Sequence, residues 1–160
     1  MMHDNIIEIS NSAFWNAKNI RSFGVENLPK DLETLSVAAL YRAGSNLIIT
    51  QLPTKITEIP SFSLAAGAGV NIATFGSAEH PITSMEADAL NGAGDGNTVT
   101  AMTIYCSGSG KIKAGAFNQY KVNVTELNVY STSGTAISKE EIASWKIQCA
   151  AEVNIVTGLA

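Results

Sequence analysis

Residues 28–53 read LPKDLETLSVAALYRAGSNLIITQLP, and they hold the clearest copy of a pattern that recurs along the chain. It contains a small residue followed by a large apolar one, Ala39-Leu40, with apolar residues seven and four positions before the small one, at Leu32 and Leu35. An alternating apolar segment follows at 47–52 and is closed by a proline. Alternation is typical of a strand, and proline of the turn after it. The stretch therefore predicts one structural unit with a single short strand.

The same pattern recurs five times along the chain. The small residues of the five pairs are separated by 26, 24, 26 and 27 positions, and they are Ala13, Ala39, Ser63, Ala89 and Ala116. Apolar residues fill nine of the ten positions that lie four and seven places before them, and only Ser109 departs. Because 46% of the chain is hydrophobic, chance would fill about half of these positions. The recurrence therefore indicates a structural repeat.

An apolar spacing of two and then three positions follows most of these pairs. It occurs at Leu47, Ile49 and Leu52, at Val70, Ile72 and Phe75, and at Val122, Val124 and Leu127; Val99, Ala101 and Ile104 match more weakly, and Ile20, Ser22 and Val25 in part. A unit of about 25 residues cannot bury its own apolar side chains, but stacked units cover one another. We therefore expect one strand per unit, paired in parallel with the next.

A family resemblance rests on particular residues of these units. The segments Ile56-Thr57-Glu58-Ile59, Ser63-Leu64 and Asn71-Ile72 resemble the BspA-like leucine-rich repeat, and residues 28–53 resemble the version carried by phage proteins of bacterial hosts. The resemblance implies a leucine-rich-repeat-like solenoid with a β-rich α/β repeat. It would hold about five stacked units of 24–27 residues over residues 6–130, each with one parallel strand. The Gly/Ala-rich loops at 65–69 and 91–97 depart from the family pattern.

The tail, residues 131–160, does not repeat. Ser138 and Glu141 have the spacing of a capping box, and Ile142 and Trp145 begin an apolar series at helical steps. We expect a short helix over about 139–150 that caps the solenoid, or alternatively docks on a partner. The run 153–156 could instead form a terminal strand.

Composition limits the classes of function. The chain carries a net charge of -4, only 15% of its residues are charged, and it has no run of Lys or Arg, which argues against nucleic-acid binding. We expect no membrane insertion, because no stretch approaches the roughly 20 apolar residues that a span needs, and no targeting segment is visible. Cys106 and Cys149 are expected to be reduced, buried thiols, with a disulfide as the alternative.

No residues form a catalytic constellation or a ligand set. Neither His3 nor His80 stands in a metal-binding spacing, and the loop 91–97 supplies only one carboxylate toward a calcium site. We therefore expect no enzyme activity, no metal and no cofactor.

A candidate binding face follows from the strand pattern, because the residues between the inward positions should face away from the core. This mostly neutral face consists of Ile48, Thr50, Gln51, Asn71, Thr74, Thr100, Met102, Thr103, Asn123, Thr125 and Glu126. A merely solvated sheet is the equal alternative, although exposed Ile48 and Met102 would favour contact.

The resemblance implies a function only by analogy of fold. The first hypothesis is a phage virion accessory protein of the capsid, tail or fibre. Its partners would be other virion proteins, a second copy of the chain, or a host surface protein or glycan. The alternative is a BspA-like adhesion or protein-interaction module on the bacterial cell surface.

Overall fold

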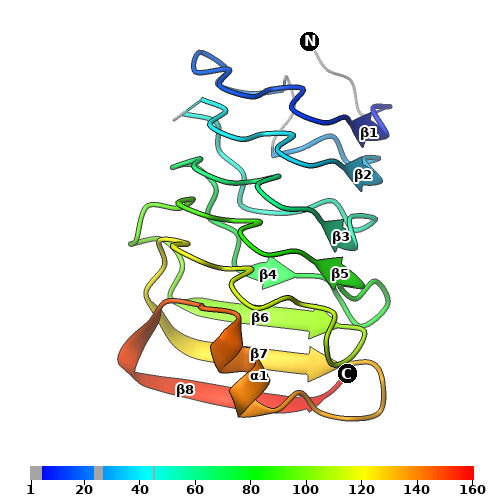
Figure 1. Ribbon diagram of the computed structural model, residues 1–160, viewed down its shortest axis with the longest axis vertical. Coiled ribbons are helices and arrows are strands. Elements are labelled where there is room, and N and C mark those ends of the chain that lie inside the picture. The colour runs from blue at the N-terminus through cyan, green and yellow to red at the C-terminus, as the bar shows by residue number, and fades with distance from the viewer. Residues whose placement is uncertain (1–4, 24–26, 45) are drawn as a thin grey trace.

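The chain folds into a parallel β-solenoid of about six turns, stacked along the long axis of the molecule (Figure 1). The computed structural model describes residues 5–23, 27–44 and 46–160. His3 and Val25, which entered the sequence argument, lie outside these residues. The first turn lies at one end of the stack and strand β8 at the other (Figure 1).

One side of the solenoid carries a ladder of two-residue strands. These strands are β1 (Glu8–Ile9), β2 (Thr34–Leu35), β3 (Glu58–Ile59) and β5 (Ser84–Met85). In register and parallel, Ile9 pairs with Leu35, Ile59 with Met85, and Met85 with Ile112. All five side chains are buried. The apolar residue four positions before each small residue therefore forms a continuous core column, as the repeat predicted.

A second side carries a four-stranded sheet, which we call the longer sheet because three of its strands have six residues or more. Its strands are β4 (Thr74–Phe75), β6 (Ala101–Cys106), β7 (Val124–Ser131) and β8 (Cys149–Leu159), which form a parallel sheet in the order β4-β6-β7-β8. Phe75, Ile104 and Val129 lie in register and are fully buried. Two parallel ladders thus enclose one core that runs through the stack.

The small residues of the repeat are stacked, as expected. The amides of Phe14, Leu40, Leu64 and Leu90 donate to the carbonyls of Ala39, Ser63, Ala89 and Ala116, over 2.9, 2.9, 3.2 and 3.4 Å. The residue before each small one has a left-handed backbone, with φ between 53° and 75° at Ser12, Ala38, Phe62, Asp88 and Gly115. This sharp turn brings the next residue onto the core, where a large side chain would not fit.

The expected α/β character of the repeat is wrong, because the described chain contains a single helix, α1 (Lys139–Ser144). The segment that would be helical in each turn lies between two left-handed residues only four positions apart, such as Ala38 and Arg42. A left-handed residue interrupts a right-handed helix. Each turn therefore has a tight corner where an α/β repeat would have a helix.

The C-terminal segment adds a turn to the stack. Ser138 caps α1 by accepting the Glu141 amide at 3.1 Å, but the helix ends at Ser144, sooner than expected. The chain then reverses at Lys146, whose φ is 65°, and enters β8, which pairs with β7. The alternative of a terminal strand is thus confirmed, and the solenoid has about six turns where five were expected.

Pairing between the third and fourth turns is interrupted before Thr74, because the fourth turn is extended. Phe75 pairs with Ile104, 29 positions later, whereas Ile104 pairs with Val129, 25 positions later. At this interruption the buried hydroxyl of Tyr120 accepts the Ile72 amide at 2.7 Å and donates to the Ile72 carbonyl at 3.0 Å. Burial raises the pKa of Tyr120 well above its usual range. One side chain from the fifth turn therefore completes the backbone pairing of the third.

Candidate binding surfaces

Most of the predicted binding face is exposed, and part of it lies on strands β4, β6 and β7 of the longer sheet. Eight of its residues are exposed and Thr103 is half-buried; the exposed ones are Ile48, Thr50, Gln51, Thr74, Thr100, Asn123, Thr125 and Glu126. Thr74 lies in register with Thr103, and the Thr125 hydroxyl donates to the Thr100 carbonyl at 3.1 Å. The strands therefore bring neutral side chains from neighbouring turns side by side.

Two members of the predicted face are corrected by the structure. Met102 is fully buried and Ala101 is exposed in its place, because Met102 lies in register with buried Leu127. Asn71 is only 8% exposed. Its Oδ1 accepts the Asp95 amide at 3.1 Å and its Nδ2 donates to the Ala68 carbonyl at 3.2 Å. Both side chains thus have structural roles inside the solenoid.

A cleft of about 330 Å³ opens beside this face, between the second and third turns. Residues 50–54 line one side, and Ala73, Thr74, Gly76 and Ser77 line the other. The cleft forms because the amides of Thr50 and Gln51 donate to the Asn27 side chain, at 2.6 and 3.1 Å, and so turn away from the third turn. β4 then pairs only with β6.

An aromatic ridge runs along the corner of the first three turns, and the sequence reasoning missed it. We use this name for Trp15, Tyr41 and Phe62, whose rings pack edge to face. The ring centroids of Trp15 and Tyr41 lie 5.2 Å apart, and those of Tyr41 and Phe62 lie 5.7 Å apart. Trp15 is 54% exposed and Phe62 is 38% exposed. The ridge is therefore a continuous apolar surface open to solvent.

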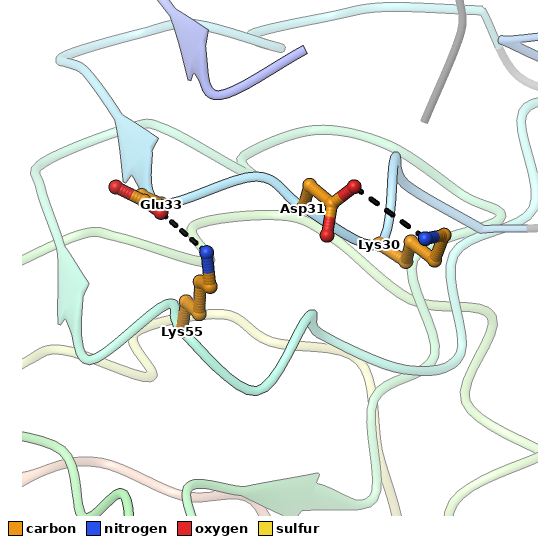
Figure 2. Close-up of polar contacts among 4 residues, drawn as sticks. All are labelled: Lys30, Asp31, Glu33 and Lys55. Carbon is orange, nitrogen blue, oxygen red and sulfur yellow. Dashed lines mark hydrogen bonds and ion pairs between the residues drawn. The ribbon is translucent and has the colours of Figure 1, made fainter. Parts of the chain in front are cut away.

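Cationic side chains flank the ridge. The Arg42 guanidinium lies 5.1 Å from the centroid of the Tyr41 ring. Arg42 also lines a shallow hollow of about 390 Å³ together with Asn16, Lys18 and three alanines. Within the described ranges the ion pairs are Lys30–Asp31 and Lys55–Glu33, which lie elsewhere (Figure 2). Neither Lys18 nor Arg42 belongs to these pairs, so both cations leave uncompensated positive charge at the hollow, and Arg42 carries it against the Tyr41 ring.

Three further side chains, those of Asp95 and the two cysteines, have shifted pKa values. The Asp95 carboxylate accepts the amides of Asn97 and Thr98 and the Thr98 hydroxyl, and these bonds, above all the hydroxyl's, lower its pKa. Both cysteines are free thiols, but the expectation that both are buried is wrong for Cys149, which is half-buried because it begins the edge strand β8. Burial raises the pKa of each thiol.

The described residues hold neither a cluster of metal-binding side chains nor a membrane-spanning helix. They contain no group of three or more His, Cys, Asp or Glu side chains placed to hold a metal ion. In the same residues, no helix has the length and apolar character needed to cross a membrane.

No protein-family model matches the chain, and neither the curated proteins nor the solved structures contain a match to it. The fold assignment therefore rests on the parallel ladders and their register.

Proposed function

We propose that this chain is a non-enzymatic binding module, and specifically a phage virion accessory protein of the leucine-rich-repeat type related to BspA-like proteins. The resemblance of residues 28–53 to phage proteins supports the source, and the stacked repeats support a scaffold for contacts. The observation that carries the binding role is the aromatic ridge with Arg42 beside it.

The composition of the ridge suits a protein contact. Trp, Tyr and Arg are the residue types that most often dominate protein–protein binding energy. Isolated exposed apolar side chains are ordinary, but a contiguous exposed group is typical of an interaction site. Here three rings from successive turns form such a group. The uncompensated charges of Lys18 and Arg42 favour a partner with acidic side chains at the rim of the contact.

The test begins with virions purified from a phage that encodes the chain. Mass spectrometry should detect the chain in banded particles, and Trp15→Ala with Tyr41→Ala should reduce its incorporation at least about tenfold, as expected for loss of a binding hot spot. Val37→Ala is the matched control, because Val37 is 48% exposed and belongs neither to the ridge nor to the predicted binding face. Absence of the chain from virions contradicts the virion role, and full incorporation of the ridge variant contradicts the role of the ridge.

The second candidate is a BspA-like adhesion module on the bacterial surface. The neutral, Thr-rich outer face of the longer sheet and the adjoining cleft favour it, because such a surface suits polar ligands. The test is binding of the purified chain to host cells or immobilised glycans. Thr50→Ala with Thr74→Ala should weaken this binding, and Trp15→Ala with Tyr41→Ala should retain it. This pair of results would support the second candidate over the first.

A further inference from the structure

β8 leaves the last turn of the solenoid with an open sheet edge. It is the final strand of the sheet and pairs with β7 on one side (Figure 1). After a register shift between Val124 and Glu126, residues 154–159 pair continuously with residues 126–131. No strand in the described residues pairs with the other edge of β8. Six consecutive residues therefore present a regular strand at the rim.

The register shows which backbone groups face outward. The Ala160 amide donates to the Ser131 carbonyl at 3.0 Å, and Ser131 lies in register with Leu159. In a parallel ladder the N–H and C=O of one residue point to the same side, and successive residues alternate. The backbone of even-numbered residues in this segment therefore faces β7. The backbone N–H and C=O groups of Ile155, Thr157 and Leu159 face away from the sheet as free donors and acceptors.

This edge lacks the sequence features that prevent exposed edge strands from pairing with one another. Monomeric proteins place Lys, Pro or a bulge on such edges. Residues 154–159 contain no charged residue and no proline, and the irregularity of β8 lies before them. The same segment exposes 40% of Val156 and 57% of Leu159, and Ile155 is only partly buried against the core. Pairing with another strand would cover both the free backbone groups and this apolar surface.

We propose that two copies of the chain pair antiparallel through residues 154–159 of β8, about a two-fold axis. A strand edge is complementary to itself under such an axis, and two-fold dimers are the commonest protein oligomers. The four-stranded sheets of the two copies then form one continuous sheet. Head-to-tail stacking fits less well, since the first described strand at the opposite end, β1, has only two residues. This inference stands on the sheet edge and is independent of the ridge.

The test measures molecular mass in solution by light scattering coupled to size-exclusion chromatography. The native chain should have twice its 16.8 kDa mass, and Thr157→Pro should have the single mass. Proline at 157 removes an outward N–H while the ladder to β7 keeps its hydrogen bonds. Val156→Asp is a second variant that puts a carboxylate on each copy near the axis, and it should also be monomeric. Val37→Asp, at a side chain that is 48% exposed in the second turn, is the control that should stay dimeric.

Circular dichroism separates loss of pairing from loss of fold, and Val156→Asp decides if Thr157→Pro does not fold. The inference is overturned by a native mass of 16.8 kDa at every concentration, or by a dimer that persists in the folded variants. It is also overturned by a mass beyond the dimer or by loss of the dimer in Val37→Asp. If the chain is a dimer but is absent from virions, this inference holds and the proposed function fails. If the chain is present in virions but is a monomer, the proposed function holds and this inference fails.

Discussion

At the scale of single residues, one atom in the column of small side chains lowers the free energy of unfolding. The Oγ of Ser63 is buried and has no hydrogen-bond partner, whereas the buried members of the column in neighbouring turns are alanines. A buried hydroxyl without a partner costs about 1–3 kcal/mol. We expect Ser63→Ala to raise the free energy of unfolding by about 1 kcal/mol, measured by urea denaturation. Ala89→Ser is the reciprocal control and should lower it; a destabilised Ser63→Ala would show that the hydroxyl is satisfied.

Tyr120 is the residue on which the interrupted ladder depends. Its hydroxyl satisfies both the N–H and the C=O of Ile72, deep in the core. Tyr120→Phe keeps the ring but leaves both backbone groups without a partner, so we expect a loss of about 2–4 kcal/mol in unfolding free energy. Tyr105→Phe is the matched control, because Tyr105 lies on the outer side of β6 against Tyr130. Equal stability of the two variants would contradict the bridging role.

At the scale of elements, the corner of each turn depends on two left-handed residues. The second of the pair is Asn16, Arg42, Ala66, Gly92 and Gln119 in successive turns. A residue other than glycine costs roughly 1–2 kcal/mol in this conformation. Gln119 is exposed, with φ 52°. Gln119→Gly should therefore raise the free energy of unfolding by about 1 kcal/mol, which thermal denaturation would show as a higher midpoint. Gln119→Ala should change the midpoint little. A lower midpoint for the glycine variant would argue against this corner.

The elements also show how far the sequence predicts the structure. Positions four before each small residue and the small residues themselves were placed correctly, because stacking every 24–27 residues imposes one periodicity on both. The predicted orientation of Met102 was wrong, because its side chain faces the core. The fourth turn is longer, so that paired residues are 29 positions apart there and 25 positions apart in the next turn, and the apolar pattern alone does not reveal which of Ala101 and Met102 faces inward. Helices were expected by analogy with the family, and the paired left-handed residues that exclude them have no common residue type.

The candidate binding surface was harder to predict than the core. Trp15 and Tyr41 each stand two positions after a small residue, which is a signal the sequence did contain. Phe62, however, stands one position before Ser63, so it breaks the period and joins the ridge only through the packing of adjacent turns. A contact between turns at different repeat positions cannot be read from periodicity, because that argument compares only equivalent positions.

At the scale of the whole molecule, stability should rise from the first turn toward the middle of the stack. A solenoid is stabilised mainly by contacts between neighbouring turns, and an end turn has one neighbour where an inner turn has two. The burial pattern agrees, since Ala13 is exposed and Phe14 is partly buried in the first turn, while Ser63 and Leu64 are fully buried in the third. We therefore expect local opening to begin at the first turn.

Amide hydrogen exchange can test this gradient with a control built into the repeat. The amides of Phe14 and Asn16 donate to the next turn, and those of Leu64 and Ala66 do so at the equivalent positions, two turns further on. Because the hydrogen bonds are matched, a difference in exchange reports the stability of the turn. We expect the first set to exchange at least about tenfold faster in the native protein. Equal protection of both sets would instead mean that the solenoid opens only as a single cooperative unit, with no weak end.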